Sequence, residues 1–192
     1  IKMNKFGGWA IQESCFNLIK EILPEGKTIL EFGSGHGTDA LSKHYKMISV
    51  ENQPEWVGKF DSHYIEVPIK PYSGNNQILT KGLFESEITL NVPDNMPPDL
   101  PGEHSPLQKG WFDHILLSEK IKDLKYDLIL VDGPNGAIGR GGFLKYLNIF
   151  NTDLPLIFDD INRESEMQLM VKISEKLNRP YKILNTTTGY IL

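Results

Sequence analysis

The chain contains a single cysteine, Cys15, among its 192 residues. One thiol excludes an intrachain disulfide and any zinc site built from several cysteines. No apolar run reaches the roughly 20 residues that a membrane span needs, and the first residues are not typical of a signal peptide. We therefore expect a cytoplasmic protein with no membrane association. Internal repeats and low-complexity tracts are also absent from the sequence, which excludes repeat architectures.

Positive charge is in the minority. The chain has 20 Lys and Arg residues against 25 Asp and Glu residues, for a net charge of −5. Nucleic-acid surfaces depend on clustered Lys and Arg that contact phosphates, so this balance argues against a nucleic-acid partner. A hydrophobic share of 40% and a charged share of 23% are typical of globular proteins. The length fits one domain, which we expect to span residues 1–192.

Short apolar runs alternate with segments of helical periodicity along most of the chain. Strands are predicted at 28–32, 45–51, 64–69, 127–132 and 154–159, and helices at 11–22, 39–44, 54–60, 115–124, 141–150 and 165–177. The last segments, 181–185 and 189–192, are predicted to pair as an antiparallel hairpin. This alternation indicates an α/β fold, a doubly wound and mostly parallel sheet with helices on both faces.

The stretch from about 71 to 110 interrupts this alternation. It contains prolines at positions 71, 93, 97, 98, 101 and 106, and it has too few apolar residues for a core of its own. Segments of this kind are uncommon inside compact domains and are often functional. We interpret the stretch as an insertion with one short strand at 88–90, and we expect it to cover a bound substrate.

Three glycines follow the first predicted strand, in the sequence EFGSGHGT from Glu31 to Thr38. Glycines allow the backbone to approach a ligand closely, and the helix that follows favours negative charge at its N-terminus. The spacing is G-x-G-x-G, not the dinucleotide pattern G-x-G-x-x-G. Glu51 ends the second predicted strand, where an acid can accept hydrogen bonds from ribose hydroxyls. Together these features predict a nucleoside-bearing ligand, with a tight turn that binds nothing as the alternative.

The segment from Glu31 to Thr38 resembles motif I of the class I S-adenosylmethionine-dependent methyltransferases, and Glu51-Asn52 resembles their ribose-binding acid. The resemblance implies a seven-stranded, Rossmann-like methyltransferase fold that ends in an antiparallel hairpin. It also implies S-adenosyl-L-methionine as the cofactor. The residues that it assigns to cofactor binding are Trp9 in the N-terminal arm, Glu31, Gly33, Ser34, Gly35, His36, Gly37, Thr38, Glu51 and Asn52.

Three further segments, 6–11, 131–140 and 158–163, are similar to polysaccharide-linked methyltransferases of the glucuronoxylan 4-O-methyltransferase type. That group has V-D-G-P…G-R and H-D-x-D-R segments. Residues 131–134 with 139–140 match the V-D-G-P…G-R segment. In the H-D-x-D-R segment, Asp159 and Asn162 stand where the group has His and Asp. The narrower resemblance implies methylation of a hydroxyl on a small-molecule or carbohydrate-like acceptor.

Methyl transfer to a hydroxyl requires alignment of the two substrates and removal of the acceptor proton. Asp132 ends the fourth predicted strand, and Asp159-Asp160 end the fifth. Adjacent residues of an extended chain point to opposite faces, so we expect only one of this pair in the site. Asp132 and Asp160 are the expected catalytic residues, with Asp159 as the alternative to Asp160. A direct general base is the more economical account. The alternative is a divalent metal ion held by Asp132 and one of the pair, as in catechol-type O-methyltransferases.

Arg140 and Arg163 each follow one of these acids by a few residues. Either can bind the carboxylate of an anionic acceptor such as a uronate, because guanidinium and carboxylate geometries match. An ion pair that orients the neighbouring acid is the alternative for both.

We therefore expect an S-adenosylmethionine-dependent methyltransferase. One alternative is a nicotinamide-dependent oxidoreductase that uses the same crevice, which the glycine spacing disfavours. The other is a non-catalytic domain that binds a cofactor or a partner protein. Acids at the ends of both the fourth and the fifth strand disfavour that alternative, because a binding module does not need them.

Overall fold

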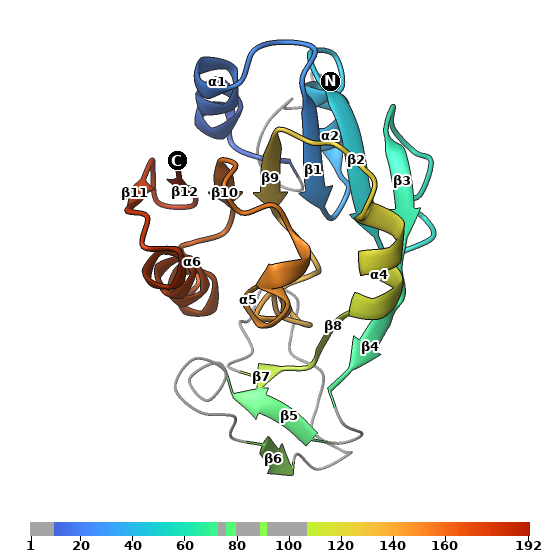
Figure 1. The fold of residues 1–192 in the computed structure, drawn as a ribbon, viewed down its shortest axis with the longest axis vertical. Coiled ribbons are helices and arrows are strands. Elements are labelled where there is room, and N and C mark those ends of the chain that lie inside the picture. The colour runs from blue at the N-terminus through green and yellow to red at the C-terminus, as the bar shows by residue number, and fades with distance from the viewer. Residues whose placement is uncertain (1–9, 73–75, 80–88, 92–106) are drawn as a thin grey trace, which may run out of the picture.

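A seven-stranded sheet forms the centre of the protein (Figure 1). The computed structural model describes residues 10–72, 76–79, 89–91 and 107–192. Side by side, the strands are β11 (Tyr181–Ile183), β12 (Gly189–Ile191), β10 (Leu156–Phe158), β9 (Leu128–Val131), β1 (Thr28–Phe32), β2 (Lys46–Glu51) and β3 (His63–Glu66). All neighbours are parallel except where β12 pairs with β10 and β11. The doubly wound, seven-stranded sheet and its C-terminal antiparallel hairpin are thus confirmed.

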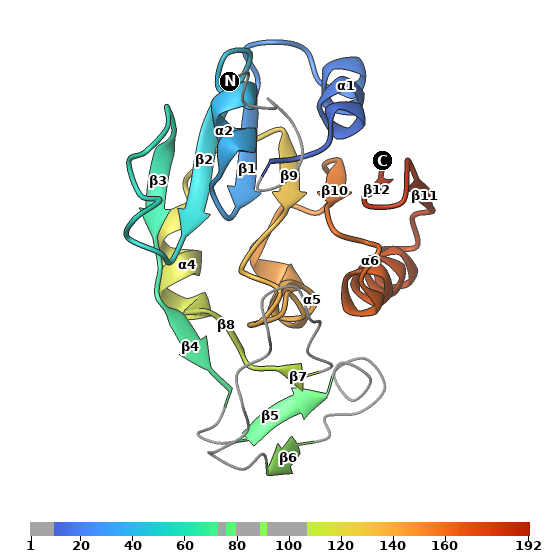
Figure 2. The ribbon, with the colours of Figure 1, turned by 180° about the vertical axis from the view of Figure 1, so that it is seen from behind.

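Helices cover both faces of this sheet (Figures 1 and 2). On one face, α1 (Glu13–Ile22) and α2 (His36–Leu41) bury a core that includes Cys15, as its place on the apolar side of a helix predicts. On the other face lie α4 (His114–Ile121), α5 (Gly142–Lys145) and α6 (Glu164–Leu177). Within the described residues, no helix is long and apolar enough to span a membrane.

The larger core is built around Phe32, the last residue of β1. Its ring lies between 5.3 and 5.9 Å, centroid to centroid, from those of Trp111, Phe112, Phe143 and Phe150. Two of these aromatics come from β8 (Gly110–Phe112), a strand that the sequence did not predict. Because Phe32 directly precedes the first glycine of the loop, this cluster fixes the point from which the loop starts.

Three predicted elements differ from the observed ones in kind or continuity, and the helix predicted at 39–44 lies three residues earlier, as α2. Residues 54–60 form turns instead of a helix, with Gly58 at a φ of +76° that ends regular structure. The strand predicted at 64–69 is divided at Pro68, which cannot donate a ladder hydrogen bond, into β3 and β4 (Ile69–Pro71). The helix predicted at 141–150 breaks at Tyr146, whose φ of −112° is not helical, into α5 and a 3₁₀ turn, η1 (Leu147–Ile149).

The described parts of the 71–110 stretch form small strands beyond the carboxyl ends of the central sheet (Figure 2). β4 pairs with β8, and β5 (Asn76–Leu79) is flanked by β6 (Thr89–Asn91) and β7 (Leu107–Gln108). β6 corresponds to the short strand predicted at 88–90. These strands therefore lie at the edge of the sheet where the predicted site residues also lie.

The strand order reverses between β1 and β9. In doubly wound sheets, ligands bind outside the carboxyl ends of the strands at such a point. The loops that leave the two strands touch there: a Cβ on Gly133 would lie 2.7 Å from the Gly33 nitrogen, so only glycine fits. The two loops that carry most of the predicted site residues are therefore held against each other by backbone contact.

Candidate functional site

The glycine loop, residues 33–38, begins with a sharp turn at Gly33, whose φ is +84°. A Cβ at this position would be strained, and it would lie 3.4 Å from the Asp132 carbonyl oxygen. The loop leads directly into α2, where the Gly35 amide donates a hydrogen bond to Thr38 Oγ1 at 3.0 Å. Gly37 lies in the first turn of α2, buried against Ile11.

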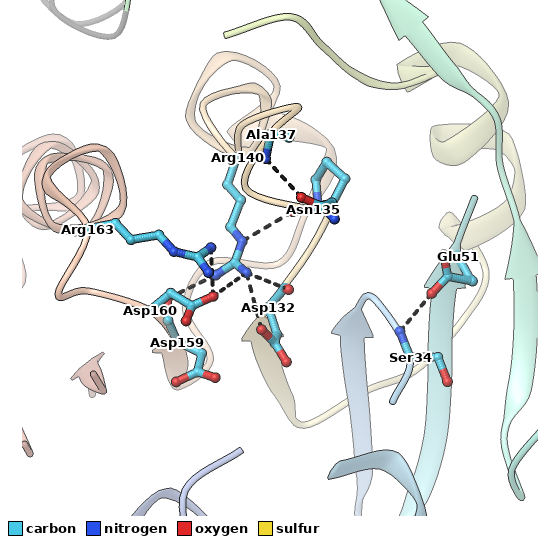
Figure 3. A network of polar contacts seen from close by, with 10 residues as sticks. Ser34, Glu51, Asp132, Asn135, Ala137, Arg140, Asp159, Asp160 and Arg163 are labelled. Atoms are coloured by element: carbon cyan, nitrogen blue, oxygen red, sulfur yellow. Dashed lines mark hydrogen bonds and ion pairs between the residues drawn. The ribbon is translucent and has the colours of Figure 1, made fainter. Parts of the chain in front are cut away.

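Glu51 joins the end of β2 to the glycine loop. One carboxylate oxygen accepts a hydrogen bond from the Ser34 amide at 2.8 Å (Figure 3). The other accepts from the amides of Asn52 and Gln53, at 2.7 and 2.9 Å. A carboxylate can accept about four hydrogen bonds, so Glu51 can accept about one more from a ligand.

Glu31 lies beneath the loop and is nearly inaccessible to solvent. Its Oε1 accepts hydrogen bonds from Thr38 Oγ1 at 2.7 Å and from Ser49 Oγ at 2.5 Å. Burial raises the pKa of the Glu31 carboxyl from 4.5 to about 7, although these hydrogen bonds oppose the rise. Glu31 thus connects α2 to β2 through hydrogen bonds with Thr38 and Ser49. Its predicted contact with a cofactor stays a prediction.

A hydroxyl group missed by the sequence analysis also supports the loop. Tyr64, on β3, lies 2.9 Å from Ser34 through their hydroxyl oxygens, and its oxygen accepts a hydrogen bond from the Phe60 amide. Only the tertiary structure brings β3 to the loop after β1, so no local pattern signals this contact. His36 is exposed on the same side, with its ring 5.7 Å from that of Phe60.

Three carboxylates, which we call the acidic centre, meet at the ends of β9 and β10. Asp132, Asp159 and Asp160 each place an oxygen within 4.8 Å of the others. The expectation that only one of the adjacent pair reaches the site is therefore wrong. The reason is the left-handed backbone at Asp160, with a φ of 62°, because strict alternation holds only for an extended chain. Non-glycine residues adopt this conformation rarely, and often at functional sites.

Arg140 projects into the acidic centre from the loop after β9 (Figure 3). Only 4% of the residue is exposed. Its Nη2 contacts Asp132 Oδ1 at 3.2 Å and Asp160 Oδ2 at 2.8 Å, and it donates to the Asp132 carbonyl at 2.7 Å. Nη1 donates to the Asp159 carbonyl at 2.9 Å, and Nε donates to the Pro134 carbonyl at 3.3 Å. With its donors engaged in this way, Arg140 fits the orienting ion pair better than the binding of an acceptor.

Arg163 is the more accessible of the two arginines. Its Nη1 lies 2.9 Å from Asp160 Oδ2, and 23% of its side chain is exposed. The guanidinium lies over Gly136, where a Cβ would be only 2.6 Å from Nη1. Binding of an anionic acceptor by Arg163 therefore stays a prediction.

The three carboxylates of the acidic centre outnumber the two guanidinium groups that contact them. Asp159 Oδ1 is buried and has no hydrogen-bond partner within the described part of the chain. Burial, with the neighbouring Asp160, raises the pKa of Asp159 to about 6. Burial and the carboxylate of Asp159 likewise raise the pKa of Asp132, against the opposing effect of Arg140. Such a centre is suited to hold either a proton or a hard cation with oxygen ligands.

The predicted residues thus gather in two groups. Asp132, Asp160, Arg140 and Arg163 lie together, joined by Asp159, whereas the glycine loop, Glu31, Glu51 and Asn52 form the other group. The contact of Gly33 with Gly133 connects the two groups. Trp9 lies outside the described residues.

No model of a known protein family matches the sequence, and a search of curated proteins found none similar to it. Solved structures that are similar include the MycE methyltransferase from the mycinamycin biosynthetic pathway in complex with Mg, SAH and mycinamycin VI. Its TM-score is 0.43 and its identity 10%, over 87% of this chain and 41% of that chain. A second structure of MycE with Mg and SAH gives a TM-score of 0.46 and 9% identity, over 91% of this chain and 43% of that chain. This chain spans about two fifths of their length.

A similarity of this size identifies neither an activity nor a ligand for this chain. The resemblance to the glucuronoxylan type also stays a prediction.

The environments of the two arginines predict different costs of replacement. Arg140→Met removes a buried guanidinium that binds the partly exposed carboxylates of Asp132 and Asp160 and three backbone carbonyls, and it should lower the free energy of unfolding by about 3 kcal/mol. Arg163→Met removes one partly exposed ion pair and should cost at most about 1 kcal/mol. Urea denaturation at neutral pH, followed by circular dichroism, compares the variants. Equal losses for both would contradict the central position of Arg140.

The pKa of Glu31 predicts a pH-dependent loss of stability. Between pH 4.5 and 7 the folded state keeps a proton that the unfolded state releases, so the free energy of unfolding falls as pH rises through this range. Glu31→Gln cannot ionise and should gain about 3 kcal/mol relative to the wild type between pH 4.5 and 8. Urea denaturation of both proteins across this range measures the difference, in which the other titrating groups cancel. Parallel pH profiles would show that Glu31 titrates normally.

Proposed function

We propose that the protein is an S-adenosylmethionine-dependent methyltransferase that methylates a hydroxyl oxygen of a small-molecule or carbohydrate-like acceptor. One observation carries the proposal. Where the strand order reverses, the glycine loop lies against the loop after β9. Glu51 is hydrogen-bonded to the first of these loops, and the second begins at Asp132 of the acidic centre. The first group suits a nucleoside, and the second suits the removal of a proton from a hydroxyl. A methyltransferase needs both functions on adjacent loops.

The residues near the glycine loop fit the cofactor. Glu51 can accept about one further hydrogen bond, which matches a ribose hydroxyl. Gly33 has no side chain that would keep a ligand away from the loop backbone at that position. We propose that Ser34, Gly35, His36, Gly37, Thr38 and Asn52 complete the cofactor site, with Trp9 covering it and Glu31 supporting it from below. When bound, S-adenosyl-L-methionine supplies the activated methyl group.

The unpartnered Asp159 oxygen favours a divalent cation over the direct general base. Three carboxylate oxygens within 4.8 Å of one another are ligands of the kind that Mg²⁺ prefers. Asp132, Asp159 and Asp160 would hold the ion, and Arg140 would fix the directions of Asp132 and Asp160. Such an ion lowers the pKa of a hydroxyl that binds to it. The two acids predicted to be catalytic would then act as ligands.

We further propose that residues 71–110 are an insertion in a single domain, 1–192, and that this insertion borders the acceptor. Its described strands lie beyond the carboxyl edge of the sheet, on the side of the acidic centre (Figure 1). Arg163, whose side chain is partly exposed, is the residue best placed to bind an anionic acceptor.

Calorimetric titration with SAH, NAD and NADP tests the cofactor. SAH should bind with micromolar affinity, and Glu51→Ala should weaken it at least about tenfold, because the loop loses its tie to β2 and the ribose loses an acceptor. Glu55→Ala, at an exposed position in the same segment, is the matched control and should bind as the wild type does. Binding of a nicotinamide nucleotide instead would favour the oxidoreductase. Failure to bind any of the three would favour a non-catalytic domain.

Titration with Mn²⁺, followed by electron paramagnetic resonance of the free ion, tests the acidic centre. The wild type should bind one ion, and Asp159→Asn should weaken binding by at least about tenfold, because a ligand loses its charge. Asp153→Asn, at an exposed position shortly before β10, controls for the loss of one negative charge. If the wild type binds no Mn²⁺, the result would contradict the cation site and favour a carboxylate that acts directly as the general base.

A further inference from the structure

The turn that carries Arg140 is hydrogen-bonded to the last residues of the 71–110 stretch. Gln108 is 1% exposed, and its Oε1 accepts a hydrogen bond from the Gly141 amide at 2.8 Å. The next residue, Lys109, donates its amide to the Ile138 carbonyl at 2.8 Å. These two bonds clamp the chain on both sides of Arg140.

The glycines beside Arg140 leave room for this clamp. A Cβ on Gly139, where φ is +94°, would lie 2.2 Å from Gln108 Oε1. A Cβ on Gly142 would lie 2.1 Å from Cγ of Trp111. The side chains of Gln108 and Trp111 therefore occupy the space beside the turn at these two positions.

We propose that Gln108 is a positioning residue for the acidic centre. It fixes the Gly139–Gly141 turn, and Arg140 transmits that position to the acids. From the fixed turn, Arg140 holds the carboxylates of Asp132 and Asp160 and the carbonyl of Asp159.

The same residue connects the acidic centre to the insertion. Gln108 belongs to β7, where it pairs with Ile78 of β5. Both ribbon views place β7 next to α5, whose first residues follow the Arg140 turn (Figures 1 and 2). A displacement of the three-stranded sheet β6-β5-β7 would therefore move the carboxylates through Gln108 and Arg140. The effect on a bound cation rests on the proposed function, whereas the effect on the backbone does not.

Hydrogen exchange of the full chain, read by mass spectrometry, tests this coupling. Gln108→Met keeps the length of the side chain but removes the acceptor oxygen, and Gln108→Glu keeps that oxygen. Gln168→Met removes a side-chain amide of the same kind on α6, where it contacts Glu164 at 2.9 Å. Gln108→Met should speed exchange about fivefold at 139–142 and also at 159–163, the segment that Arg140 holds. Gln108→Glu should exchange more slowly than Gln108→Met in both segments, and Gln168→Met should match the wild type.

Faster exchange confined to 139–142 would overturn the proposal, because Gln108 would then have only a local structural role. Equal exchange in Gln108→Met and Gln108→Glu would also overturn it, because the acceptor oxygen would be irrelevant.

Mn²⁺ titration gives the second readout. Gln108→Met should weaken Mn²⁺ binding about tenfold while SAH affinity is unchanged, since outer partners of a metal ligand have effects of this size. An unchanged Mn²⁺ affinity would contradict positioning of the carboxylates. If the wild type binds no Mn²⁺, the proposed cation fails, and the exchange at 159–163 alone decides the role of Gln108.

Discussion

The pairing of Arg140 with the acids at the ends of β9 and β10 is the interaction on which the rest of the site depends. Charged groups lose much of their hydration on burial, so carboxylates this close together need a cation with good geometry. Arg140 supplies it through five contacts, three of them to backbone carbonyls, so that it fixes the loops as well as the charges. Arg163 adds a second positive charge at Asp160. The three carboxylates outnumber the two guanidinium groups by one, and Asp159 Oδ1 has no hydrogen-bond partner among the described residues.

The two acids near the glycine loop have a different task. Glu51 accepts a hydrogen bond from the Ser34 amide in the loop, and Glu31 accepts hydrogen bonds from the hydroxyl groups of Thr38 and Ser49. Both acids are buried. Together with the backbone contact between Gly33 and Gly133, they make the loop after β1 and the loop after β9 into one rigid unit. The distance between the glycine loop and the acidic centre is therefore set by folding.

Sequence patterns predicted the elements whose signal is local. The strands of the central sheet, the hairpin and the loop after β1 follow from apolar periodicity and glycine spacing, and so does the placement of Asp132 at a strand end. The failures have long-range or unusual backbone causes. The left-handed turn at Asp160 brings two adjacent acids together, and no residue pattern signals it. Gln108 reaches Gly141 across 33 positions, and Tyr64 reaches Ser34 across 30, so neither partner is visible in a local window.

The way in which residues 107–111 contact the rest of the chain limits how the 71–110 stretch can be exchanged. In sequence, residues 107–110 belong to the insertion and Trp111 directly follows it, but Gln108 and Trp111 occupy space that Gly139 and Gly142 leave open. A chimera that takes a whole insertion from another protein would replace Gln108 but keep Gly139, which leaves room for it. A graft that ends before Leu107 keeps both residues, so the segment that can be exchanged is shorter than the interruption in the sequence pattern.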